Sequence, residues 1–133
     1  MFELPPYTRL EDPLERLLGH IDMRMAMIDG PAEGFTCFVG TMAQETFASN
    51  EALREASSES ITAYCEALAV DVQAAIDRHG IRDNITAESV AWHVQTVLQG
   101  AFVIAKASGD PEKARESVRH LRRYIEAIFN ISS

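Results

Sequence analysis

The chain has little of what stabilises small secreted proteins or anchors membrane proteins. Cysteine occurs only twice in 133 residues, at Cys37 and Cys65, and both lie within apolar patterns of helical period. This placement predicts reduced, buried thiols in an intracellular protein, with a redox-sensing pair as the alternative. Near the amino terminus, Phe2 to Leu10 is short and broken by two prolines, so no signal peptide is expected. We therefore expect a cytoplasmic protein.

Basic residues are also scarce. Twelve Lys and Arg stand against twenty Asp and Glu, which gives a net charge of −8 and excludes nucleic acid as a direct partner of the chain as a whole, because phosphate binding depends on clustered basic residues. The local exception runs from Lys113 to Arg123, but Glu112, Glu116 and Glu126 lie at helical spacings from its basic residues and favour an ion-paired surface. No apolar run reaches the roughly 20 residues that a bilayer requires, so no membrane partner is expected.

Catalytic and metal-binding motifs are missing as well. The sequence contains no H-x-x-x-H, no C-x-x-C, no G-x-S-x-G, no phosphate loop and no glycine-rich dinucleotide turn, and these are the patterns that bring ligands or nucleophiles together locally. We therefore expect neither a metal nor a cofactor. An enzyme is the least favoured interpretation.

The rest of the chain consists mainly of segments with helical periodicity, separated by residues that begin or end helices. After an extended lead-in over residues 1–11, capping residues, prolines and glycines divide residues 12–133 into five amphipathic segments. No strand alternation is present, so we predict an all-α domain, a five-helix antiparallel bundle. The expected helices run from Pro13 to about Ile28, Phe35 to about Ala48, Glu51 to His79, Ala87 to Ser108, and Pro111 to about Phe129.

The segment from Thr86 to Ser108 has more apolar surface than one small core can cover. A broad sector expected to face the core contains Val90, Val94, Val97, Leu98, Ala101, Ile104 and Ala105. Beside it lies a second sector of Trp92, Thr96, Gly100, Val103 and Ala107. In a chain of this size, a helix that is apolar around most of its circumference predicts a partner, and we favour a second copy of the chain.

Soft and aromatic side chains lie on the secondary faces of several helices, together with polar groups. Such a set is typical of a small-molecule cavity between helices, although the same residues could simply fill a core. The predicted ligand-binding residues are Met23, Met27, Phe38, Met42, Phe47, Tyr64, Leu68, Trp92, Gln95 and Gln99.

The stretch GFTCFVGTMAQETFASNEALR, at positions 34–54, resembles the second-half signature of TetR-family transcriptional regulators. In that signature a G-C-x-x-G-x-x-A-x-E helix is followed by a polar cap and a long helix that opens near a Leu-Arg pair. The matching residues are Gly40, Ala43, Glu45, Asn50, Leu53 and Arg54. Cys37 is displaced relative to the first glycine, and Glu51 stands where proline is common. The resemblance continues through Thr86, Leu98, Gln99 and Gly100 and into Val118 to Phe129.

This resemblance implies the regulatory domain of a transcriptional repressor, which binds a small apolar effector and forms a homodimer. The last two helices of each subunit would form a four-helix bundle, with an interface at Thr96, Gly100, Val103, Ala107, Val118, Leu121, Tyr124 and Ile125. The eleven residues ahead of Asp12 cannot hold the family's helix-turn-helix head, so DNA would be bound only through a domain not present in this chain. The chain is then an excised domain or a natural headless version. The alternative is a helical dimerisation module without an effector.

Overall fold

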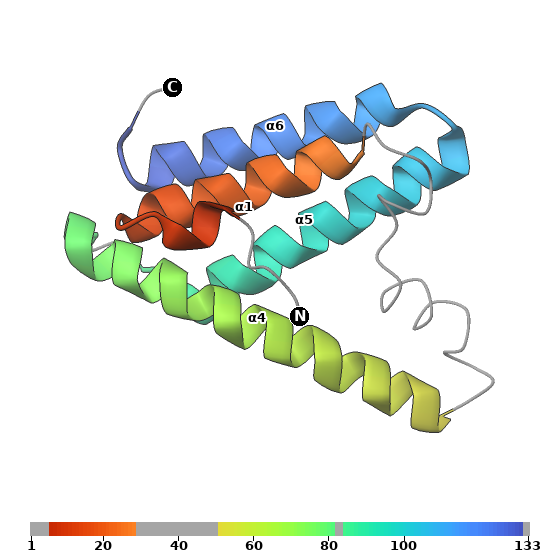
Figure 1. Cartoon of the computed structure of the whole chain (residues 1–133), viewed down its shortest axis with the longest axis horizontal. Helices are drawn as coiled ribbons and strands as arrows, with labels where there is room; N and C mark the ends of the chain where they lie inside the picture. Colours follow the sequence, from red (N-terminus) through yellow and green to blue (C-terminus); the bar gives the residue numbers. More distant parts are fainter. Residues whose placement is uncertain (1–5, 29–50, 82–83, 132–133) are drawn as a thin grey trace.

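In the computed structural model, the described residues are 6–28, 51–81 and 84–131, and they form a helical bundle (Figure 1). A short 3-10 helix, η1 (Pro6–Arg9), precedes α1 (Pro13–Met27), and α4 (Glu51–His79), α5 (Ala87–Ser108) and α6 (Pro111–Ile128) follow. No strand occurs in this part of the chain, which confirms the all-α prediction there. The predicted helix at 35–48 lies outside the described residues, so the count of five stays a prediction. Phe38, Met42 and Phe47, three of the predicted ligand-binding residues, lie outside them too.

Capping residues begin the helices where the sequence predicted. The Asp12 carboxylate accepts a hydrogen bond from the Leu14 amide at 3.0 Å, and Pro13, which has no N–H to satisfy, follows it in the first turn. The same combination of an Asp cap and a following proline recurs at Asp110 and Pro111, where the Asp110 carboxylate accepts a hydrogen bond from the Glu112 amide at 3.1 Å. Thr86 caps α5 by accepting from the Ser89 amide. Each cap satisfies an amide that the helix itself leaves without a partner.

Two glycines end the long helices in the left-handed conformation. Gly80 follows α4 with a φ of 64°, and Gly109 follows α5 with a φ of 68°. A side chain is disfavoured at this φ, which explains why glycine is used at both stops. The amide of Gly109 donates to the carbonyl of Ala105 at 3.1 Å and closes the last turn of α5.

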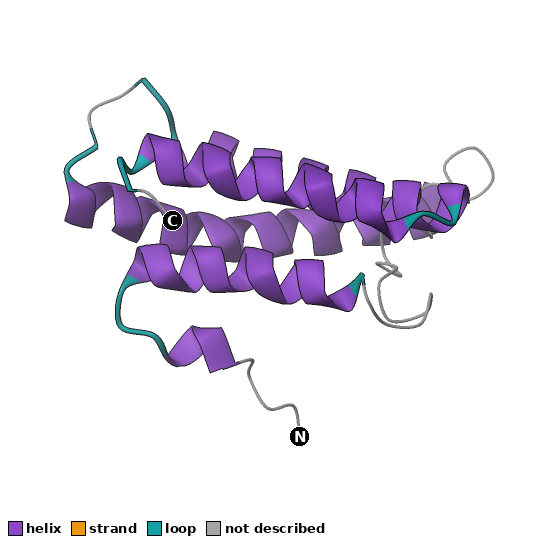
Figure 2. Ribbon diagram, turned by 90° about the horizontal axis from the view of Figure 1, so that it is seen from above, coloured by secondary structure: helices purple, strands orange, loops and turns teal. Residues whose placement is uncertain are grey.

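Helix α5 is the central element of the packing. It lies against α4 on one side and α6 on the other, while α1 packs against both α4 and α6, and Figure 2 shows the helices running side by side as a bundle. The amino-terminal part of α4 extends beyond the end of α1 in Figure 1. Because only α4 and α6 pack along α5, one long flank of α5 is covered by no described helix.

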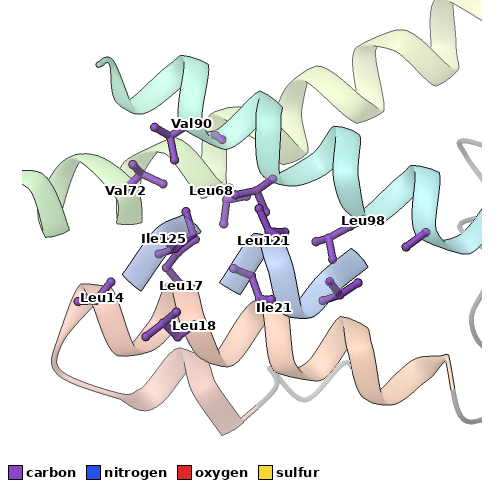
Figure 3. Close-up of a cluster of buried hydrophobic side chains, with 14 of the residues drawn as sticks. Leu14, Leu17, Leu18, Ile21, Leu68, Val72, Val90, Leu98, Leu121 and Ile125 are labelled. Carbon is purple, nitrogen blue, oxygen red and sulfur yellow. The ribbon is translucent and has the colours of Figure 1, made fainter. Parts of the chain in front are cut away.

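The core lies where apolar stripes from four helices meet. In Figure 3, labelled side chains of α1, α4, α5 and α6 point toward one another across the bundle. Leu17 and Ile21 of α1, Val72 of α4 and Val94 of α5 are fully buried. Burying a side chain of this size stabilises the fold by about 1.5–3 kcal/mol. The apolar stripe of α1 is thus used inside the subunit.

The terminal helix corrects one part of the predicted dimer interface. Val118, Leu121 and Ile125 are 0%, 3% and 0% exposed within the single chain, so they have no surface left to bury against a second copy. The single apolar stripe of α6 is used to pack on the rest of the subunit. Tyr124, on the neighbouring face, is 42% exposed, and its assignment to an interface stays a prediction.

Helix α5 differs from the prediction at the edge of its core sector. Ile104, expected in the core, is 49% exposed, whereas Ala91 and Phe102, which were not assigned to it, are buried at 0% and 2%. The buried face of α5 is therefore rotated away from Ile104 and toward Ala91 and Phe102 relative to the predicted one.

None of the helices in the described part of the chain combines the length and the apolar character needed to cross a membrane.

Candidate functional site

A groove of about 470 Å³ lies along the uncovered flank of α5 and is bordered by α4. Ile61 of α4 lines it together with Trp92, Gln95, Thr96, Gln99, Gly100, Val103 and Ile104 of α5. Most of this lining is apolar, and two amides and one hydroxyl supply polar groups, which is the usual composition of a small-molecule site. The structure thus brings together three predicted ligand-binding residues and three predicted interface residues.

The spacing of these residues divides the groove into two rims. Gln95 and Gln99 are four residues apart and lie on one face of α5. Gly100 lies on the opposite rim. His93, seven residues before Gly100 on the same face of α5, does not line the groove, and its ring meets the ring of Tyr124 on α6 with centroids 5.1 Å apart. One rim therefore faces the α4 side of the groove and the other continues onto α6.

The glutamine rim carries polar atoms that lack partners. Gln95 is 6% exposed, and within the described part of the chain the Oε1 atoms of Gln95 and Gln99 are buried and accept no hydrogen bond. A buried acceptor without a donor costs about 1–3 kcal/mol. Such groups are therefore candidates for contact with a bound molecule.

A buried arginine lies close to the same face of α5. The Arg24 side chain of α1 is buried, with 7% of the residue exposed, and its guanidinium carbon lies 4.7 Å from the ring centroid of Phe102. Phe102 follows Gln99 by three residues and shares its side of the helix. Arg24 Nη1 donates to the Tyr64 hydroxyl at 2.7 Å, whereas Nη2 has no hydrogen-bond partner among the described residues.

His20 links this arginine to the lead-in segment. The Tyr64 hydroxyl is hydrogen-bonded to His20 Nε2, and the Tyr7 hydroxyl of η1 lies 3.0 Å from His20 Nδ1. Burial, and secondarily the positive charge of Arg24, lowers the pKa of His20 to about 4. Burial likewise raises the pKa of Tyr64 to about 12. Near pH 7 the histidine and the tyrosine are therefore both neutral, and Arg24 is the charged member of the network.

The remaining predicted ligand-binding residues are dispersed. Tyr64 belongs to the network around Arg24, and Leu68 is buried in the core. Met23 is half-buried on α1, and Met27 is 38% exposed near the end of that helix. None of these four lines the groove.

Arg24 and His20 were not predicted as site residues from the sequence. A signal for Arg24 was available, because it lies three residues after Ile21 and four before Ile28, so it falls on the buried stripe of α1. A charged residue at such a position indicates a specific partner or a functional role. His20 precedes Ile21 directly, and nothing in the sequence connects it with Tyr64.

The other polar features of the described chain do not form a reactive centre. No group of three or more His, Cys, Asp or Glu in this part of the chain could hold a metal ion. Cys65 is buried at 1% exposure, and burial raises the pKa of its thiol, which disfavours the reactive thiolate. On α6, Arg115 and Arg119 both pair with Glu112 at 2.9 Å, which confirms the predicted ion-paired surface.

A second hollow of about 460 Å³ lies between the lead-in, α1 and α6. Most of its charged lining is already engaged, because Arg122 pairs with Asp22 at 2.7 Å and Asp12 caps α1 while approaching His79 at 3.8 Å. Its remaining carboxylate, Glu15, is exposed, and within the described chain no buried polar atom of this lining lacks a partner. We therefore take the groove on α5 as the candidate site.

Comparison with known proteins points to one family. Residues 13–121 match the sequence model described as tetracyclin repressor-like, C-terminal domain. The fold is similar to the crystal structure of a TetR-family transcriptional regulator from Cytophaga hutchinsonii, with a TM-score of 0.74 and 17% identity over 91% of this chain. The chain spans 60% of the length of that regulator. No curated protein gives a significant match.

Proposed function

Since this chain belongs to the family of tetracyclin repressor-like C-terminal domains, we propose that it is the effector-binding and dimerisation domain of a TetR-like bacterial transcriptional regulator. DNA would be contacted only by a helix-turn-helix domain outside this chain, and no enzymatic step is assigned to it. The observation that carries the proposal is the groove on α5, which has an apolar lining and amide oxygens without partners.

The α4-side rim of the groove is the part proposed to bind the effector. Trp92 and Ile61 offer apolar surface there, and Gln95 and Gln99 offer acceptors that a ligand can satisfy. A molecule bound between α4 and α5 would favour one placement of these helices over another. In an intact regulator this shift would change the spacing of the two DNA-binding heads, which is how the effector would act.

The α6-side rim is the part proposed to form the dimer. Ile104 and Tyr124 are 49% and 42% exposed, and exposed apolar side chains of this size gain most by being covered. At Gly100 an added Cβ would meet nothing within 4 Å, so a helix of a second chain could approach closely. Thr96, Val103 and Ala107 complete the proposed interface.

Light scattering coupled to size exclusion tests the dimer. We expect the wild-type chain to elute as a dimer at micromolar concentration. Ile104→Arg should weaken it by at least about tenfold, because burying an unpaired charge costs several kcal/mol. Val70→Arg is the matched control, since Val70 is 68% exposed on α4 and lies outside the proposed interface.

The outcomes separate the proposal from its rivals. A monomeric wild type, or a dimer equally weakened by both variants, contradicts the proposed interface. A stable dimer that binds no small molecule at the groove would instead indicate the dimerisation module without an effector. Calorimetric titration with apolar ligands distinguishes these two cases.

A further inference from the structure

Arg24 carries a buried positive charge that no described residue neutralises. Its Nη1 contacts a neutral tyrosine hydroxyl and its guanidinium lies over the rings of Phe102 and Tyr64. Rings and hydroxyls stabilise a cation only in part. A buried charge without a counter-ion is costly, so a site of this kind gains from an anion that binds there.

The neighbouring carboxylates are already engaged with other arginines. Asp22, on the same helix, pairs with Arg122 at 2.7 Å, and Asp71 of α4 pairs with Arg16 at 3.0 Å. Arg16, the partly exposed arginine of α1, thus has a carboxylate partner, whereas the buried Arg24 has none among the described residues. Among the described residues, Nη2 of Arg24 is the donor left over.

Arg24 does not itself line the groove, and its relation to the groove is through the buried ring of Phe102. Phe102, on which the guanidinium rests, shares one face of α5 with Gln95 and Gln99, and both glutamines line the groove. An apolar molecule lying along Trp92 and Ile61 would have its polar end on this face. A carboxylate there would accept from the amide N–H groups of the glutamines, because rotation of a glutamine amide exchanges its oxygen and its nitrogen. We propose that the effector is an apolar molecule with a carboxylate head, and that Arg24 binds this head. This proposal rests on the proposed effector-binding function.

The chemistry of the site favours a carboxylate over an uncharged head. A guanidinium offers parallel N–H donors whose geometry matches the two oxygens of a carboxylate. The guanidinium carbon lies 4.7 Å from the centroid of the Phe102 ring, and this contact limits the movement of the fork. A hydroxyl or amide head could accept one of these hydrogen bonds but would leave the charge uncompensated.

Octanoate and octanol, titrated calorimetrically at pH 7 below their aggregation limits, are the probes. The wild-type chain is expected to bind octanoate about 10- to 100-fold more tightly than octanol, the range given by a hydrogen bond to a charged group. Arg24→Met should remove this preference. The variant should fold, because it replaces an unpaired buried charge with an apolar side chain of similar length, and circular dichroism checks this.

Two further variants make the test specific. Arg16→Met removes another arginine of α1, one already paired with Asp71, and should keep the preference for octanoate. Arg24→Lys keeps the charge but loses the fork, so octanoate binding should weaken several-fold while octanol binding stays unchanged. If Arg24→Met fails to fold, the loss of octanoate binding in Arg24→Lys tests the proposal instead.

Equal binding of octanoate and octanol by the wild type would overturn the carboxylate inference while leaving the proposed effector role standing. A preference that survives in Arg24→Met would overturn it as well, because the anion would then be bound elsewhere. If neither probe binds, both the inference and the effector role fail, while the dimer is still judged by light scattering.

Discussion

At the scale of single residues, the arginines of the chain differ in their burial and in their partners. Arg16 and Arg122 have carboxylate partners at the surface, whereas Arg24 is buried against rings and a hydroxyl. The burial of Arg24 could have been predicted from its spacing to Ile21 and Ile28. Its contact with Tyr64 could not, because the two residues are 40 positions apart and meet only through the packing of α1 on α4.

His20 makes stability depend on pH. Its pKa is about 4 in the folded chain against an ordinary value of 6.5, so between these values the unfolded chain binds a proton that the folded chain does not. Stability should therefore fall as pH drops from about 6.5 toward 4, by at most about 3 kcal/mol from this residue. Urea unfolding at a series of pH values measures the effect.

The variant His20→Gln isolates this contribution from those of the carboxylates. The groups facing His20 are Tyr7, Tyr64 and Arg24, and they remain in the variant. The difference in free energy of unfolding between wild type and variant should change between pH 6.5 and 4 and be constant above pH 7. A difference that is the same at every pH would show that His20 is not held neutral.

At the scale of elements, helix starts and stops were the most predictable feature. Asp12 with Pro13 and Asp110 with Pro111 begin helices for local reasons, since a cap needs only its own next turn. It was harder to predict which face of α5 is buried. Ile104 was expected in the core but is exposed. Helical periodicity gives the relative angles of side chains, but the packing of α4 and α6 decides which of those angles is covered.

The left-handed stop at Gly109 gives a prediction for one element. An added Cβ there would touch nothing within 4 Å, yet φ is 68°, so the cost of Gly109→Ala comes from backbone strain alone. We expect a loss of about 1 kcal/mol. Gly109→Asn, a residue that tolerates this conformation, should lose less. Equal losses in urea unfolding would mean that strain is not the cause.

At the scale of the whole molecule, one core joins α1, α4, α5 and α6. Leu17 is fully buried and belongs to a cluster with residues of α4, α5 and α6. Leu17→Ala should therefore lower the free energy of unfolding by about 2–5 kcal/mol in a single transition. Val70→Ala, at an exposed position, should change it by less than about 0.5 kcal/mol. Separate transitions for different helices would contradict a shared core.

The predicted dimer interface shows that sequence periodicity alone does not tell whether an apolar stripe packs inside the subunit or against a second chain. An amphipathic helix with a single apolar stripe can bury it only once. For α6 the stripe of Val118, Leu121 and Ile125 was assigned to a second chain, although the subunit's own core needs it. Helix α5 is different because its apolar surface exceeds one core, and the groove lies on the flank that no described helix covers.

The groove also contains the only tryptophan of the chain, Trp92, which is 38% exposed. Its intrinsic fluorescence is therefore a label already in place at the candidate site. Dehydration of the indole by any occupant of the groove would shift the emission to shorter wavelength, with no background from other indoles. The same optical signal could screen chemical libraries for ligands without attaching a dye.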